Sequence, residues 1–177
     1  MALIIEDGTG KADASSYDSI ENINAYLLAR GKITETETEG VYTPEITETT
    51  AIYATQSLDN LYEPTLQGER AVDGQALAFP RTGIVMFGRD VALNTVPLRI
   101  KNAIAEMCLL IASGVDVSPI IETGIKRKFE KVGPITEETE FSGSGVTGGT
   151  GVLSTVVNEL KPLLKQGGAS NGIIRRW

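Results

Sequence analysis

The side chains that most often carry out proton transfer and nucleophilic attack are nearly absent from this sequence. It contains no histidine, and its one cysteine is Cys108. Histidine is best suited to proton transfer near neutral pH, and a reactive cysteine needs a basic neighbour that lowers its pKa. No such neighbour lies near Cys108 in the sequence, so we expect an inert, buried thiol. The acidic pair Glu137-Glu138 lies in a solvated segment with no motif around it. We therefore predict no catalytic residues and no enzyme activity.

The sequence also lacks the common patterns that bind metals and phosphates. One cysteine and no histidine exclude the Cys/His zinc patterns, and no D-x-D-x-D-G loop is present for calcium. The glycine-rich segment 142–151 lacks the Gly-Lys-Ser/Thr ending of a phosphate-binding loop. We expect no metal and no cofactor, and we interpret 142–151 as a linker.

Acidic residues dominate the N-terminal part of the chain. The whole sequence has a net charge of −7; residues 1–68 hold 3 basic and 12 acidic residues (−9), and residues 69–177 hold 13 basic and 11 acidic residues (+2). Affinity for nucleic-acid phosphates comes mainly from lysine and arginine. The acidic part therefore disfavours flat binding to nucleic acid. It suits solubility, or a surface along which DNA passes without binding.

A β-hairpin predicted over residues 125–141 concentrates opposite charges on its two arms, which meet at the turn Gly133-Pro134. Opposite charges on adjacent strands attract, so pairing within the hairpin or with a neighbouring subunit is the simplest role for them. Contact of the basic arm with phosphate is the alternative. The candidate subunit-interface residues are Lys126, Arg127, Lys128, Lys131, Glu137 and Glu138.

The C-terminal segment has the composition of an arm that docks on a partner. An apolar helix predicted over about 152–164 lies between two glycine-rich stretches, and Pro162 should kink or shorten it. The alternative is a helix folded back on the same core with a frayed tail. Tryptophan and arginine dominate the energetics of protein interfaces. The candidate partner-binding residues are the last five, Ile173, Ile174, Arg175, Arg176 and Trp177.

Three further helices are indicated by apolar residues at helical spacing and by capping residues at their ends. They cover residues 16–31, with Ser19 as the cap and Gly31 at the end; about 43–62, starting at Thr43-Pro44-Glu45; and about 97–113, opened by Val96-Pro97.

Residues 63–96 are predicted to be irregular, because glycine and proline interrupt them repeatedly. Phe79 precedes a proline, which restricts Phe79 to an extended backbone. We expect Phe79 to fill the core, and Arg81 to emerge at the surface or to pair with an acid.

Together these elements predict a mainly α fold, a small bundle of about four helices with a protruding β-hairpin and a C-terminal arm. We expect a helical core over residues 1–141, with the hairpin at about 125–141, and a glycine-tethered helix and tail over 142–177. No apolar run approaches the ~18 residues of a membrane span, and the start lacks the features of a signal peptide. We therefore expect a soluble protein.

Short blocks of the sequence resemble a family of tailed-phage proteins. The blocks occur in the same order in that family, and the similarity covers about residues 1–135. Its members are often labelled DnaT-like single-strand-DNA-binding proteins, and they also resemble head–tail connector proteins, known as adaptor or head-completion proteins. The matching blocks are Met1-Ala-Leu-Ile-Ile-Glu-Asp-Gly-Thr-Gly10, Gln75-Ala-Leu-Ala-Phe-Pro-Arg81, Val96-Pro97 and Lys131-Val-Gly-Pro-Ile135.

The resemblance implies a structural adaptor of the phage neck. Connectors of this kind form rings, usually of twelve subunits, that join the portal protein to other neck or tail-terminator proteins and continue the DNA channel. Double-stranded DNA then passes through without specific binding, and the protein is located in the neck of the virion, or in the host cytoplasm before assembly. The alternative is a single-stranded nucleic-acid-binding protein, which needs a basic groove with stacking aromatic residues. The best candidates for that groove are residues 126–131 and Arg175-Arg176-Trp177.

Overall fold

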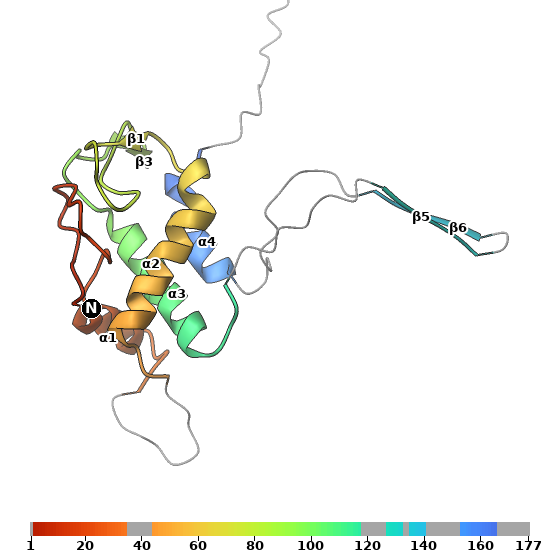
Figure 1. The fold of residues 1–177 in the computed structure, drawn as a ribbon, viewed down its shortest axis with the longest axis horizontal. Coiled ribbons are helices and arrows are strands. Elements are labelled where there is room, and N and C mark those ends of the chain that lie inside the picture. The colour runs from red at the N-terminus through yellow and green to blue at the C-terminus, as the bar shows by residue number, and fades with distance from the viewer. Residues whose placement is uncertain (1, 35–43, 118–126, 133–134, 141–152, 166–177) are drawn as a thin grey trace, which may run out of the picture.

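Four helices form the body of the protein in a computed structural model that describes residues 2–34, 44–117, 127–132, 135–140 and 153–165 (Figure 1). The fold is mainly α, as the sequence predicts, and short antiparallel strand pairs complete it. The helices are α1 (Ile20–Ala29), α2 (Glu48–Tyr62), α3 (Leu98–Ala112) and α4 (Ser154–Leu160).

Helix α3 is the centre of the core, because α1, α2 and α4 all pack against it. Its side chains Ile100, Ile104 and Met107 are completely buried. These residues recur at a spacing of three and four, which places them on one face of a helix. The predicted helix over 97–113 is thereby confirmed, and its first residue directly follows Pro97.

The ends of α1 follow from its capping residues. The Ser19 side chain accepts a hydrogen bond from the backbone N–H of Asn22 at 3.3 Å, which satisfies a donor that the first turn leaves free. After the helix, Gly31 adopts a positive φ of 62°, a conformation that only glycine takes readily. Both predicted caps are confirmed.

Helix α2 begins later than the sequence predicts. Its cap is Thr47, whose hydroxyl accepts the backbone N–H of Thr50 at 3.2 Å. The residues on either side of this cap, Ile46 and Ala51, are both buried and lie at the positions of a hydrophobic staple. The predicted start at residues 43–45 is therefore wrong. Thr47 caps the helix instead, because the residue before it, Ile46, is buried at the position of a hydrophobic staple.

Residues 63–97 form a loop region with two pairs of two-residue strands. Strand β1 (Glu69–Arg70) pairs with β2 (Arg81–Thr82), and β3 (Val85–Met86) pairs with β4 (Arg89–Asp90), all antiparallel. A single 3₁₀ turn, η1 (Glu63–Thr65), links α2 to this region. The side chain of Phe79 is completely buried, as predicted.

Arg81 does not reach the surface, which corrects one of the two expectations for it. It is only 6% exposed. Its guanidinium donates to the carbonyl oxygens of Gln67 at 2.8 Å and Gly68 at 2.7 Å. It also lies 3.7 Å from the carboxylate of Glu63, so the expected acidic partner is present. The half-buried carbonyl groups of Gln67 and Gly68 need donors, and the arginine fork supplies them.

Helix α4 belongs to the core. Val156 and Leu160 are completely buried, and α4 packs against α3 (Figure 1). The helix ends at Leu160, and a 3₁₀ turn, η2 (Lys161–Leu163), contains Pro162, so the predicted shortening is confirmed. The alternative of a helix folded back on its own core therefore describes α4. Residues 166–177 lie outside the described part of the chain.

The hairpin expected near residues 125–141 is present as β5 (Arg127–Val132) and β6 (Ile135–Glu140). The two strands pair antiparallel in a register from Arg127 opposite Glu140 to Val132 opposite Ile135. Figure 1 shows the hairpin standing away from the helices.

Candidate functional site

The described residues offer little for covalent or metal chemistry. Cys108 is completely buried in α3, and burial raises the pKa of its thiol to about 12. The predicted inert thiol is thus confirmed, because a thiolate is the reactive form. Within the described ranges, no group of three acidic or cysteine side chains is arranged to hold a metal ion. No helix in these ranges has the length and apolar character needed to cross a membrane.

Asp59 and Tyr17 form the most perturbed titratable pair. The Tyr17 hydroxyl lies 2.8 Å from both carboxylate oxygens of Asp59, and desolvation raises the pKa of each group. The pair also accepts the backbone N–H groups of Ala78 and Phe79, at 2.8 and 3.1 Å. All of these partners belong to the chain itself, and neither residue lines a cleft. The pair therefore fixes the loop before β2.

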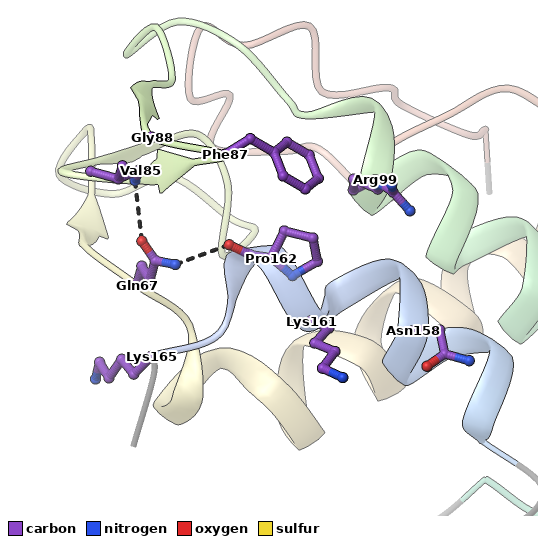
Figure 2. A pocket seen from close by; sticks show the side chains of 9 residues that line it. All are labelled: Gln67, Val85, Phe87, Gly88, Arg99, Asn158, Lys161, Pro162 and Lys165. Carbon is purple, nitrogen blue, oxygen red and sulfur yellow. Dashed lines mark hydrogen bonds between the residues drawn. The ribbon is translucent and has the colours of Figure 1, made fainter. Parts of the chain in front are cut away.

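A cleft of about 840 Å³ opens between the β3–β4 hairpin and the C-terminal helical segment (Figure 2). It has no acidic side chain among its lining residues and is built from segments that are far apart in the sequence. The lining residues are Gln67, Val85, Phe87, Gly88, Arg99, Asn158, Lys161, Pro162 and Lys165.

Phe87 is an unusual residue for its position. With Gly88 it forms the two-residue loop between β3 and β4, and both residues have positive φ, 53° and 76°. Such a loop normally carries Asn-Gly or Asp-Gly, because a bulky side chain is strained there. The Phe87 side chain is nevertheless 73% exposed. Backbone strain that is not offset by burial of the side chain is typical of functional sites.

Gln67 holds the walls of the cleft together. Its side-chain oxygen accepts the backbone N–H of Val85 at 3.1 Å. Its amide nitrogen donates to the carbonyl oxygens of Pro162 at 3.0 Å and Leu164 at 3.1 Å. Figure 2 shows this side chain between the two segments. One amide thus ties the hairpin that carries Phe87 to the turn after α4, so the cleft is preformed.

Three cations border the cleft. Arg99 stands at the start of α3, with its guanidinium carbon 5.9 Å from the centre of the Phe87 ring. It is partly neutralised by Glu159 of α4, at 2.8 Å. Lys161 and Lys165 are exposed, and the Lys165 ammonium donates to one backbone carbonyl. An exposed aromatic ring beside a cation can stack on a planar group, and the cation can attract an anion next to that group.

None of the residues selected from the sequence is among the described residues that line the cleft. The five tail residues and Lys126 are outside the described part of the chain. In the hairpin, Arg127 is opposite Glu140, whereas Lys128 and Lys131 are opposite threonines, and Glu137 is opposite Glu130. Between the described residues of β5 and β6, opposite-charge pairing directly across the hairpin is therefore limited to one pair.

Sequence reasoning missed the cleft. The only signal for it was Gly88, which marks a turn and could have drawn attention to an aromatic residue at a turn tip. The cations that border the cleft are spread over two distant segments of the chain.

Comparison with known protein families identifies a family for this chain. The model of a family described as "Putative DnaT-like ssDNA binding protein" matches residues 1–177. Comparison with curated proteins and with solved structures gives no match.

Proposed function

We propose that this chain, which belongs to that DnaT-like family because the family model matches it from end to end, binds single-stranded DNA in the Phe87 cleft. A base stacks on the exposed ring of Phe87, and the neighbouring phosphates lie toward Arg99, Lys161 and Lys165. The observation that carries the proposal is the 73% exposure of Phe87 on a strained turn beside these cations.

The chemistry of the cleft suits an unpaired strand. Proteins that bind single strands without sequence preference combine a positively charged groove with aromatic rings on which bases stack. In a duplex the base faces are covered by their neighbours, so a ring cannot stack on them without unstacking the helix. The cleft supplies one ring and three cations, which is enough for one or two nucleotides. The net charge of −7 disfavours non-specific attraction of nucleic acid to the protein as a whole.

The size of each contribution can be worked out. Stacking of one base on an aromatic side chain contributes about 1–3 kcal/mol, which corresponds to a roughly 5- to 150-fold change in affinity. Three phosphate contacts would give a slope of log K against log salt concentration of about −2. A protein with a single cleft should therefore bind weakly, and its affinity should fall only about 16-fold for a fourfold rise in salt concentration.

The direct test is fluorescence anisotropy with a labelled oligothymidine, titrated at several salt concentrations. Phe87→Ala should weaken binding at least fivefold, whereas Phe87→Trp, which keeps a stacking surface, should not. Lys161→Ala with Lys165→Ala should flatten the salt slope. Leu93→Ala is the matched control, since Leu93 is 59% exposed but does not line the cleft. Equal affinity of wild type and Phe87→Ala would contradict the proposed site, and no binding by the wild type would contradict the function.

A second candidate function is the structural adaptor of a tailed-phage neck. The observation that favours it is the β5–β6 hairpin, which stands away from the helical body and so offers a surface to another protein (Figure 1). In this role several copies of the chain form a ring that joins the portal to downstream neck proteins, and DNA passes through the channel. The tail residues Ile173, Ile174, Arg175, Arg176 and Trp177 would then bind the portal or an adjacent subunit.

The two functions predict different binding partners, which can be measured separately. An adaptor should co-purify with the portal protein and appear as density between portal and tail in electron micrographs of virions. A single-strand-binding protein should shift an oligothymidine without any portal present. Absence of the chain from virions would contradict the adaptor function.

A further inference from the structure

We propose that copies of this chain join edge to edge through their β5–β6 hairpins, with β5 of one copy beside β6 of the next, in a continuous intermolecular β-sheet. This contact does not depend on binding of DNA. Pairing between copies would place several Phe87 clefts in one assembly. The same pairing would also serve as the subunit contact of an adaptor ring.

The hairpin needs a partner because it is an isolated two-stranded sheet. Each strand has six residues. Among the described strands, β5 pairs only with β6, and β6 pairs only with β5. The hairpin also stands away from the helices (Figure 1). A two-stranded hairpin without a packed face is marginally stable in water. Its formation is therefore favoured when a further strand or a second hairpin joins it.

The register leaves an electrostatic conflict inside a single hairpin. Glu130 lies opposite Glu137, and like charges directly opposite each other are destabilising. Of the three basic positions in β5, Arg127 alone lies opposite an acid, Glu140. Added strands that bring cations next to β6 would reduce this repulsion.

The charges of the two strands select one mode of association. Strand β5 carries three basic residues and one acidic residue (+2), and β6 carries three acidic residues and no basic one (−3). No other described strand pairs with the outer edge of β5 or β6, and the backbone N–H and C=O groups of such an edge can accept another strand. Pairing of two β5 edges or of two β6 edges would bring like charges together. Pairing of β5 with β6 of the next copy brings opposite charges together.

Such a contact is head-to-tail. A head-to-tail interface uses two different surfaces of each subunit, so it repeats from copy to copy until the rotation closes a ring, or continues as a filament. The inferred partner is therefore a second copy of this chain, and the expected product has more than two subunits.

The experiment measures the mass of the full-length protein by light scattering and native mass spectrometry, with no DNA and no portal present. The wild type should form oligomers of more than two chains, and these should dissociate toward the single-chain mass of 18.9 kDa as salt rises. A half-swapped variant, Arg127→Glu with Lys128→Glu and Lys131→Glu, should be monomeric in low salt.

A rescue variant separates the charge pattern from simple damage to the hairpin. Adding Glu137→Lys, Glu138→Lys and Glu140→Lys to the half-swapped variant restores a basic strand beside an acidic one. This full swap should assemble with itself but not with the wild type, because its basic strand would meet the basic β5 of the wild type. Lys11→Glu with Arg30→Glu and Arg89→Glu makes the same change in net charge on the body and should leave assembly intact.

A monomeric wild type at all accessible concentrations would overturn the proposal. So would a half-swapped variant that assembles like the wild type, or a full swap that remains monomeric although its melting temperature equals that of the wild type. None of these results depends on DNA binding, so failure here is distinguishable from failure of the proposed function.

Discussion

Replacing Asp59 with asparagine should remove the pH dependence that one buried carboxyl group contributes to folding. Asp59 is 8% exposed on α2 and is held by Tyr17 and by the backbone N–H of Ala78. Burial raises the pKa of Asp59 from 3.8 to about 6, an effect larger than the opposing hydrogen bonds from Ala78 and Tyr17. The same pair positions the loop that leads to β2 and the Phe87 hairpin.

The sign and size of the effect follow from proton binding. In the unfolded chain the Asp59 carboxyl group ionises near pH 3.8, whereas in the folded protein it keeps its proton up to about pH 6. Between these values the folded state binds more protons, so the free energy of unfolding falls as pH rises and is level above about pH 6. One pKa unit corresponds to about 1.4 kcal/mol, so the loss is about 3 kcal/mol.

The assay is urea unfolding of wild type and Asp59→Asn across the range from acid to neutral pH. Asparagine has nearly the same shape and does not titrate, and the other carboxyl groups are common to both proteins. From about pH 3 to pH 7 the stability of the wild type relative to the variant should fall by about 3 kcal/mol. A difference that stays level, or that rises with pH, would refute the inference that burial dominates the pKa of Asp59.

Three further predictions concern the core, the cleft and the tail. Phe79→Ala should lower the free energy of unfolding by ~3–5 kcal/mol, because it empties a completely buried site, and an unchanged melting temperature would contradict this. Glu159→Gln removes the carboxylate 2.8 Å from Arg99, so affinity for oligothymidine should rise severalfold, and equal or weaker binding would show that Arg99 does not contact phosphate. Deletion of residues 167–177 should leave the melting temperature unchanged and weaken portal attachment in a pull-down, and Trp177→Ala alone should cost about 2 kcal/mol of that binding; full attachment of the truncated chain would refute the role of the tail.

The helical part of this fold was predictable because its signals are local. The apolar spacing of α3, the Ser19 cap of α1 and the effect of Pro162 on α4 all act within a few residues of the chain. The start of α2 was missed for a local reason as well. Two threonines compete as caps there, and burial of Ile46 favours the second.

The placement of α4 and the environment of Arg81 could not be settled from the sequence. An apolar helix after a glycine-rich stretch fits either an arm or a core element, and only its packing on α3 decides between them. Arg81 is buried because carbonyl groups from Gln67 and Gly68 converge on it, and those residues are more than ten positions away.

The cleft was beyond sequence reasoning for the same reason. Its aromatic residue is on the β3–β4 turn, and its cations are on α3 and on the segment after α4. Hydrogen bonds of Gln67 bring these parts together. Composition averages over the whole chain, so a net charge of −7 hides a local group of three cations.

Binding of a base to Phe87 is tested by photo-crosslinking of the wild-type protein to an oligonucleotide that carries 5-iodouracil, followed by mass spectrometry of the peptides. This base crosslinks to aromatic side chains on which it stacks. If a base stacks on Phe87, the main crosslink is at Phe87 and excess unlabelled oligothymidine suppresses it. Crosslinks confined to other residues, with Phe87 unmodified, would contradict this stacking.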